Sequence, residues 1–416
     1  MLSQYFKSPS HVQRLLSRPG GSLLEGYSQY LQQRGYAKIS VCTLITAASH
    51  FLYWSDGEGI SPLELDELAL ERFADHLSRC QCQGFGNQCA VVSLRGARMF
   101  LIYRGRIGPR PTGLAALAAD LKSVQFSAFC QWMRQQRGTS DATLYNHGVA
   151  LRDLLARIGD DPGKLDAIEL RQFILEQSRK KGAAAAKHCT TALRMLVRFY
   201  IAEGKCASGL EGAIPALAHW RLSALPRYLR VDEVELIIAS CNTATPTGRR
   251  DRAILLLLAR LGLRAGDVWR LRIDDIDWKG ASISVTGKNR QQTLLPLTQE
   301  VGLAIVQYLQ QGRPRTDADT IFVRTCAPFQ AFADHAAISI IVKKAMRRAG
   351  VMCSTRGAAH VLRHSVATSM LAQGASLQDI ASVLRHQSVA TTEFYAKVDF
   401  ASLRQIAQPW PGEGPC

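Results

Sequence analysis

The sequence predicts a mainly α-helical protein with a small β-sheet in its C-terminal domain. Through most of residues 1–212, apolar side chains recur three and four positions apart, which is the period of amphipathic helices. Residues 282–297 instead alternate in polarity around a Gly-Lys-Asn-Arg turn, which is typical of a β-hairpin. The helical period then resumes at 299–311 and 339–349, with a short strand expected at 321–323 between them.

Two segments rich in proline and glycine divide the chain into domains. Residues 105–113 contain Pro109 and Pro111, and residues 209–229 contain Pro215 and Pro226. We therefore expect a helical N-terminal domain (1–112), a second helical domain with its linker (113–225), a C-terminal domain with the small sheet (226–400) and a C-terminal tail (401–416).

The first two domains share an internal repeat. Residues 32–35 recur at 135–138, residues 65–73 at 165–173, and residues 94–105 at 193–204, so the offset falls from 103 to 99. Repetition of so large a helical unit is better explained by duplication than by solenoid stacking. We interpret the N-terminal domain as a duplicate of the second helical domain, although similar amphipathic helices could also produce such a pattern.

Capping residues predict where several helices begin and end. Asp232 is expected to cap a helix that ends near Asn242. Gly374 is expected to end a helix that begins near residue 360. Ser376 and Asp379 then match the capping box of the next helix.

Composition points to a polyanionic partner. The chain of 416 residues carries a formal net charge of +17, which is characteristic of proteins that bind nucleic acid. No apolar run is long enough for a membrane span, and the N-terminus lacks the apolar core of a signal peptide. The 11 cysteines lie among helical patterns, so we expect reduced thiols in a cytoplasmic protein. Because of its positive charge, we also expect this protein to be associated with the nucleoid.

Two groups of residues invite a metal interpretation, and neither is accepted from the sequence. Cys80, Cys82 and Cys89, with His76 nearby, match no standard zinc spacing, so buried or incidental thiols are expected. His360 and His364 are four apart, but no glutamate stands between them as in a metalloprotease. No metal site is therefore predicted.

The C-terminal domain contains the groups that DNA cleavage without a metal would need. Such cleavage requires a nucleophile, fixed cations for the developing charge and a proton donor for the leaving oxygen. No acidic cluster of a two-metal nuclease is evident. Taken singly, each candidate has an ordinary structural explanation, and their order and spacing carry the functional case. The candidates are Arg264, Lys288, His360, Arg363, His386 and Tyr395.

These residues resemble the tyrosine recombinase (phage integrase) family, which includes Xer-type recombinases and integrases of mobile elements. That family has an arginine in a Gly-Leu-Arg turn, a hairpin lysine after glycine, a His-x-x-Arg-His helix, a late histidine or tryptophan, and a tyrosine. The matching segments are 262–264, 287–288, 360–364, His386 and 391–395. The resemblance covers 226–400, which it identifies as the catalytic domain. It extends to 120–212 as the helical core-binding domain of the SAM-like type, and it reaches 1–112, the possible duplicate of that domain, only through the internal repeat.

The resemblance implies a reaction and assigns its central groups. Tyr395 would attack the scissile phosphate, leaving a 3′-phosphotyrosine and a free 5′-hydroxyl. Arg264 and Arg363 would clamp the non-bridging oxygens, and Lys288 would protonate the leaving 5′ oxygen. Because the covalent link preserves the bond energy, neither ATP nor a metal nor another cofactor is expected.

The resemblance also assigns the remaining groups and exposes two departures. His360 would assist proton transfer at the tyrosine, and His386 would hydrogen-bond to the phosphate. His364 is expected to be a structural neighbour without direct chemistry. Asp267 stands where the family commonly has glutamate, and we expect it to support the first arginine. Arg385 stands where the family usually has glycine, and it could contact DNA or merely cover surface.

The expected activity is site-specific recombination or integration of double-stranded DNA, most simply for a bacterial mobile element. By resemblance, the core-binding and catalytic domains would close around the duplex, and the tail would pack on a neighbouring subunit. We expect a homo-tetramer on DNA, with a free monomer compatible, and accessory DNA-bending proteins could assist. The alternatives are a Xer-like dimer resolvase, a type IB topoisomerase and a non-catalytic DNA-binding protein of the same fold.

Overall fold

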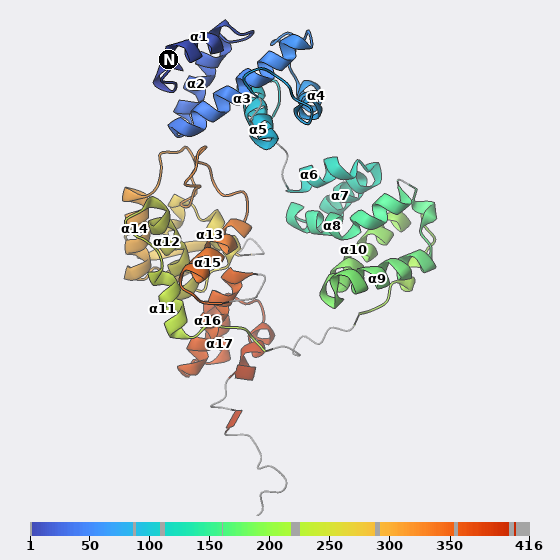
Figure 1. Cartoon of the computed structure of the whole chain (residues 1–416). Helices are drawn as coiled ribbons and strands as arrows, with labels where there is room; N and C mark the ends of the chain where they lie inside the picture. Colours follow the sequence, from blue (N-terminus) through green and yellow to red (C-terminus); the bar gives the residue numbers. More distant parts are fainter. Residues whose placement is uncertain are drawn as a thin grey trace, which may run out of the picture. The chain divides into compact units, whose positions relative to one another are not determined.

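The fold is described from a computed structural model of the chain. It describes residues 2–85, 89–108, 113–159, 161–217, 225–287, 292–352, 357–398 and 403–404. The described part is mainly helical with one small sheet, which confirms the predicted fold class (Figure 1). The chain forms two compact units: residues 107–221 make up one, and residues 1–106 with 222–416 make up the other.

The N-terminal segment is built from amphipathic helices around an aromatic core. Helix α3 packs against both α2 and α5. The rings of Phe51, Phe73 and Phe100 are fully buried among these helices. The elements are η1 (Leu2–Gln4), α1 (Pro9–Ser17), α2 (Leu23–Gln33), α3 (Lys38–Gly57), α4 (Glu67–Leu77) and α5 (Ala90–Tyr103).

The second compact unit has its own apolar core. Its buried residues include Phe126, Phe129 and Phe173, and helix α8 packs against α6 and α10. The elements are α6 (Gly113–Leu121), α7 (Val124–Arg137), α8 (Asp141–Ile158), η2 (Pro162–Lys164), α9 (Ala167–Lys181), α10 (Ala183–Ala202) and η3 (Leu210–Ala213).

Corresponding positions of the internal repeat have corresponding structures. The carboxylate of Asp66 accepts a hydrogen bond from the backbone N–H of Ala69 at the start of α4. Asp166 caps α9 in the same way, through the backbone N–H of Glu169. These matched caps support our interpretation of a duplication.

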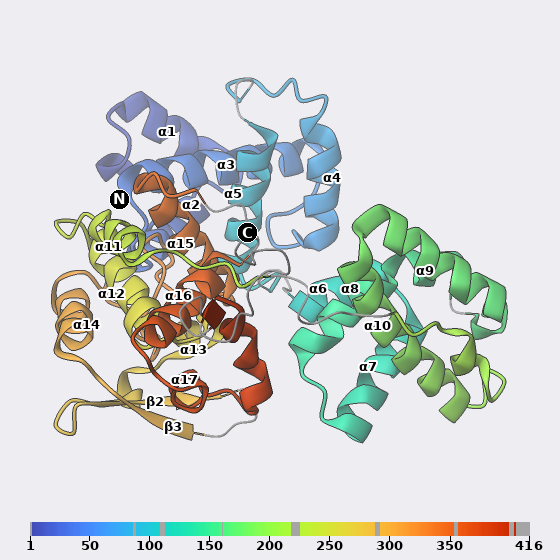
Figure 2. The ribbon, with the colours of Figure 1, turned by 90° about the horizontal axis from the view of Figure 1, so that it is seen from below.

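The C-terminal segment combines helices with a three-stranded antiparallel sheet of order β1-β2-β3. Strand β2 pairs with β3 in the register Ser282↔Pro296 to Thr286↔Gln292 (Figure 2). The elements are α11 (Val231–Ala239), α12 (Pro246–Arg260), α13 (Ala265–Arg270), η4 (Ile273–Asp275), β1 (Ile276–Asp277), β2 (Ser282–Thr286), β3 (Gln292–Pro296), α14 (Gln299–Gln311), α15 (Ala336–Arg348), α16 (Ala358–Ala372), α17 (Leu377–Val383), η5 (Val389–Thr391) and η6 (Glu393–Val398).

Two local predictions were wrong. Arg230, not Asp232, stands at the N-cap of α11, and its backbone N–H donates to the carboxylate of Glu233. Residues 321–323 form no regular strand, because pairing near them is limited to the isolated bridges Arg272↔Thr320 and Val323↔Ala331. The capping box of Ser376 and Asp379 is confirmed at the start of α17.

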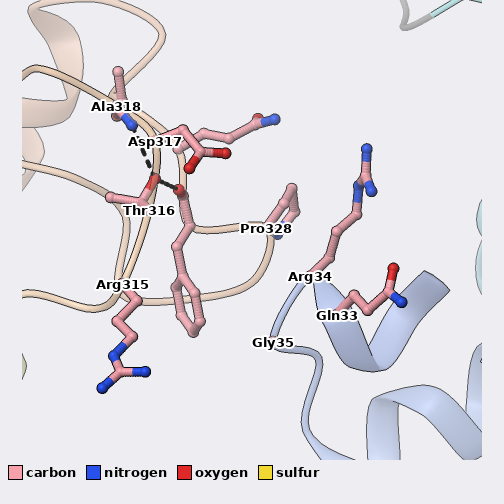
Figure 3. Close-up of a pocket in the computed structure, with 11 residues that line it drawn as sticks. Gln33, Arg34, Gly35, Arg315, Thr316, Asp317, Ala318 and Pro328 are labelled. Atoms are coloured by element: carbon pink, nitrogen blue, oxygen red, sulfur yellow. Dashed lines mark hydrogen bonds between the residues drawn. The ribbon is translucent and has the colours of Figure 1, made fainter. Parts of the chain in front are cut away.

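The loop between α14 and α15 is held by hydrogen bonds within itself. The hydroxyl of Thr316 donates to the carbonyl of Phe329, and the backbone N–H of Ala318 donates to the same hydroxyl. Figure 3 shows both bonds in the loop, which forms one wall of the pocket drawn there. None of the described helices is both long and apolar enough to cross a membrane.

Candidate functional site

The first part of the site is the sharp turn after helix α12. Gly262 has a φ of +57°, a conformation that favours glycine. A Cβ atom on this residue would lie 2.7 Å from Cδ2 of Leu384, so only glycine lets the two segments approach so closely. Leu263 is buried in the core, and Arg264 follows as the N-cap residue of α13. The turn therefore directs Arg264 toward the segment that follows α17.

Asp267 connects Arg264 with that same segment. Its Oδ2 accepts a hydrogen bond from the backbone N–H of Arg264 at 3.0 Å. The same oxygen accepts one from Nη2 of Arg385 at 2.5 Å, and both side chains of this ion pair are buried. Nη2 of Arg264 in turn donates to the backbone carbonyl of Arg385 at 3.2 Å. Asp267 thus contacts the backbone of Arg264 and the side chain of Arg385.

Arg363 lies on α16 and is almost completely buried. Its two terminal nitrogens donate hydrogen bonds to the carbonyl oxygens of Gly262 and Leu384. Burial, and then the nearby charges of Arg264 and Arg385, lower the pKa of Arg363 to about 9. At neutral pH the guanidinium is therefore still charged. The two predicted arginines meet at the same pair of segments.

Tyr395 is buried beside this cluster, in the short helix η6. Its ring packs with Ile380 and Leu384 in a small apolar cluster. Its hydroxyl is hydrogen-bonded to Nδ1 of His364 at 2.6 Å. Burial raises the pKa of Tyr395 to about 12, although Arg363 and Arg264 partly oppose this shift. The phenol is therefore neutral at physiological pH.

His386 lies beside the ring of Tyr395. Its ring is parallel to that of Tyr395, with centroids 6.5 Å apart. Its Nδ1 is hydrogen-bonded to the hydroxyl of Thr392 at 2.8 Å, and Thr392 is fully buried. Burial and the charges of Arg363 and Arg264 lower the pKa of His386 to about 4. This histidine is therefore neutral and oriented by a fixed partner.

His360 lies one helical turn before His364, with ring centroids 5.9 Å apart. Its side chain is exposed, unlike that of Arg363 on the same helix. Partial desolvation, and then the charges of Arg363 and Arg264, lower its pKa. Among the described residues, the hydroxyl of Tyr395 is hydrogen-bonded to His364 and not to His360. Lys288, the predicted proton donor, lies outside the described residues, as does most of the tail 401–416.

The charges around the tyrosine favour an anion. Three guanidinium groups, those of Arg264, Arg363 and Arg385, gather around one carboxylate, that of Asp267. Nε and Nη1 of Arg385 are buried and have no hydrogen-bond partner among the described residues. Unused donors and surplus positive charge suit a phosphate, because arginine forms paired, charge-assisted hydrogen bonds with its oxygens.

Two features of this site were not predicted from the sequence. His364 was expected to be a neighbour without direct chemistry, but it contacts the tyrosine hydroxyl itself. A usable signal was its position four residues after His360, which places both rings on one helix face. The pairing of Arg385 with Asp267 was also missed, because these residues are 118 positions apart.

Comparison with known proteins places this geometry among DNA recombinases. The sequence profile described as the Phage integrase family matches residues 227–402. A Sinorhizobium fredii protein named as an integrase/recombinase is 35% identical over 93% of this chain and 93% of its own. The tyrosine recombinase XerD of Lacticaseibacillus casei is 29% identical over 64% of this chain and 91% of its own.

Solved structures share the fold at low sequence identity. XerH bound to a palindromic difH substrate, in a post-cleavage complex, matches with a TM-score of 0.53 and 17% identity, covering 70% of this chain and 88% of XerH. A lambda integrase dimer bound to a COC′ core site matches with a TM-score of 0.51 and 18% identity, covering 78% of this chain and 90% of that one.

Proposed function

Because this chain belongs to the phage integrase family of tyrosine recombinases, we propose that Tyr395 is the residue with which it cuts and rejoins DNA. The observation that supports this assignment best is the convergence of two arginines and a buried tyrosine from three separate segments. Arg264 follows α12, Arg363 lies on α16, and Tyr395 lies on η6.

In the proposed reaction, the Tyr395 oxygen attacks the scissile phosphorus and the bond to the 5′ oxygen breaks. The tyrosine passes its proton to solvent with the assistance of His360, and Lys288 gives a proton to the leaving oxygen, so a 3′-phosphotyrosine and a 5′-hydroxyl result. Arg264 and Arg363 offer hydrogen bonds to the non-bridging oxygens as charge develops there. His386 donates a further hydrogen bond to the phosphate. Rejoining is the reverse reaction, which needs neither ATP nor a metal.

We propose that His364 positions the nucleophile. Desolvation, and then the nearby His360 and Arg363, lower its pKa to about 4, so the ring is neutral at physiological pH. A neutral Nδ1 can accept the hydrogen bond of the tyrosine hydroxyl and fix its direction. His360, which is exposed, is then left to assist proton transfer once DNA covers the site.

The partner in this proposal is double-stranded DNA, bound in the bacterial cytoplasm. Exchange between two duplexes requires four strand cuts, and each chain carries one candidate nucleophile, so we propose a tetramer on DNA. The net charge of +17 supplies the phosphate neutralisation, and binding should weaken as salt rises. We also propose the mobile-element role over dimer resolution, because nearly all of the XerD relative, 91% of its length, matches only 64% of this chain.

The decisive experiment traps the covalent intermediate. The wild-type chain and Tyr395→Phe are incubated with a nicked suicide substrate built from the DNA that flanks the gene. We expect a protein–DNA adduct that survives denaturant with the wild type, and none with Tyr395→Phe at nearly unchanged DNA affinity. Tryptic mapping should place the nucleotide on Tyr395.

Three other outcomes would point elsewhere. Sequence-specific binding without an adduct would indicate a non-catalytic DNA-binding protein. Relaxation of arbitrary supercoiled DNA by the monomer would indicate a topoisomerase. An adduct retained in Tyr395→Phe would assign the nucleophile to another residue.

A further inference from the structure

Two cysteines and two histidines converge in the N-terminal segment, far in sequence from the catalytic residues. His50, His76, Cys80 and Cys82 each present one ligand atom, and these four atoms all lie within 4.8 Å of one another. Sγ of Cys80 is 3.3 Å from Nε2 of His50, and Sγ of Cys82 is 3.3 Å from Nε2 of His76. The proposed function gives this cluster no role.

The spacing of these atoms matches a tetrahedral metal site. With Zn–S bonds of about 2.3 Å and Zn–N bonds of about 2.0–2.1 Å, neighbouring ligand atoms of a tetrahedron lie roughly 3.3–3.8 Å apart. Both sulfur–nitrogen distances are 3.3 Å, at the lower limit of this range. The other pairs of ligand atoms lie within 4.8 Å of one another. The donor set of two thiolates and two imidazoles is also one that structural zinc sites use.

The ligands come from elements that the metal would connect. His50 is buried on α3, and His76 lies in the last turn of α4. Cys80 and Cys82 lie in the loop after α4, which has no regular secondary structure in its described part. A shared metal would fasten this loop to both helices.

The surroundings are aromatic. The ring of His50 is stacked on Phe85 at 4.4 Å and meets the edge of Phe73 at 5.2 Å. His76 lies 6.0 Å from both Phe73 and Trp54, measured between ring centroids. A divalent ion with two thiolates and two neutral imidazoles has no net charge, so such an environment can hold it without a further counter-ion.

The internal repeat gives an independent reason to assign a function to the loop. In the second copy, α9 ends at Lys181 and α10 begins at Ala183, with Gly182 alone between them. In the first copy, residues 78–89 separate α4 from α5. The offset between the two copies changes only from 100 to 99 across this stretch, so the loop is not an insertion. The first copy instead has a non-helical segment, which carries both cysteines, where the second copy continues its two helices.

We propose that His50, His76, Cys80 and Cys82 bind one Zn²⁺ ion as a structural site. The protein supplies all four ligands and leaves no open position, which is the arrangement of structural and not catalytic zinc. On binding, each cysteine thiol gives up its proton and forms a Zn–S bond, and each imidazole binds through Nε2 as the neutral ring. This assignment replaces the sequence-based grouping with Cys89, which is exposed and outside the cluster.

The first test measures metal content in the full-length chain. After exposure to excess Zn²⁺ and gel filtration, we expect about one bound zinc per chain by mass spectrometry of the elements. Cys82→Ser should lose most of this zinc, and the matched control Cys89→Ser should keep it. Equal zinc content in the two variants, or a zinc-free wild type, overturns the proposal.

A second measurement uses the wild-type chain alone, so it does not depend on whether a variant folds. Cys80 and Cys82 are alkylated with and without Zn²⁺, and the modified peptides are quantified by mass spectrometry. We expect zinc to slow alkylation of both residues at least tenfold while Cys89 and Cys326, which are exposed, react unchanged. Cys80 and Cys82 that react at the same rate in both conditions, or that are joined in a disulfide, contradict the site.

Discussion

Arg385 and Asp267 form a buried ion pair, with Nη2 of the arginine 2.5 Å from Oδ2 of the aspartate. Both residues are departures from the pattern of the family, which commonly has glutamate and glycine at these positions. The backbone of Arg385 has a φ of +53°, the left-handed region that glycine adopts without strain. The two departures are therefore coupled, because the side chain of Arg385 forms its ion pair with the carboxylate of Asp267.

We predict that Arg385→Ala is more destabilising than Arg385→Gly. Both substitutions leave the carboxylate of Asp267 without its partner, and breaking a buried pair costs about 3–5 kcal/mol. The glycine variant relieves the strain of the left-handed backbone, which costs about 1–2 kcal/mol for a residue with a Cβ atom. Urea unfolding followed by circular dichroism measures the difference.

Arg385→Ala and Asp267→Asn should show coupling in a double-mutant cycle, because the two residues form one ion pair. We expect the double variant to lose less stability than the sum of the two single variants, because each single change already breaks the pair. Additive losses would show that the ion pair contributes nothing to the fold.

Gly262→Ala should impair both folding and DNA cleavage. Gly262 and Gly374 have positive φ angles of +57° and +87°, so alanine is strained at either position. Only at Gly262 would the new methyl group also meet a side chain, Cδ2 of Leu384 at 2.7 Å, whereas Gly374 has nothing within 4 Å. We expect Gly374→Ala to cost about 1–2 kcal/mol from backbone strain. Overpacking should add about 1–3 kcal/mol in Gly262→Ala.

The effect on cleavage separates these two glycines further. The carbonyl oxygens of Gly262 and Leu384 are the two acceptors of Arg363, so a shift of either segment moves that guanidinium. At a temperature where both variants are folded, Gly262→Ala should form the covalent adduct more slowly than Gly374→Ala. Equal rates would mean that the position of Arg363 does not depend on this turn.

Patterns that act over a few residues could be predicted from the sequence. Alternating polarity identified the hairpin strands Ser282–Thr286 and Gln292–Pro296, because a strand with one buried face repeats every two residues. The capping box of Ser376 and Asp379 was recognised because both of its hydrogen bonds are local. The family residues were recognised by order and spacing, since chemistry restricts which side chains can serve.

Contacts between distant residues could not be predicted in this way. Tyr395 and His364 are 31 positions apart, and His50 and Cys80 are 30 apart. Sequence spacing constrains side chains on one helix or one strand, but not the meeting of two elements in a packed core. Hence the contact of His50 with Cys80 was not predicted.

Stability should fall as the pH is lowered from about 6.5 toward 4, the interval between the ordinary histidine pKa and the lowered values of His364 and His386. Between these values the folded chain binds fewer protons than the unfolded chain, so the stability present above pH 6.5 is lost. The slope cannot exceed about 1.4 kcal/mol per pH unit for each histidine. Solvent screening reduces it, because neither ring is fully buried.

Thermal denaturation between pH 4 and pH 8 measures this dependence. His386→Gln should flatten the curve, since glutamine does not titrate. A slope that is the same in His386→Gln and wild type would contradict the assignment.

The proposed role of Lys288 as proton donor can be tested by changing the leaving group. Lys288→Ala should cleave an ordinary suicide substrate at least a hundredfold more slowly, which is the lower range for loss of a general acid, about 10²–10⁴. With sulfur in place of the bridging 5′ oxygen, the leaving thiolate is stable without a proton, so Lys288→Ala should recover much of the wild-type rate. Arg363→Ala should remain slow with both substrates, because the charge on the non-bridging oxygens is unchanged by the sulfur. A Lys288→Ala variant that is equally slow with the sulfur substrate would assign this lysine to DNA binding instead of proton transfer.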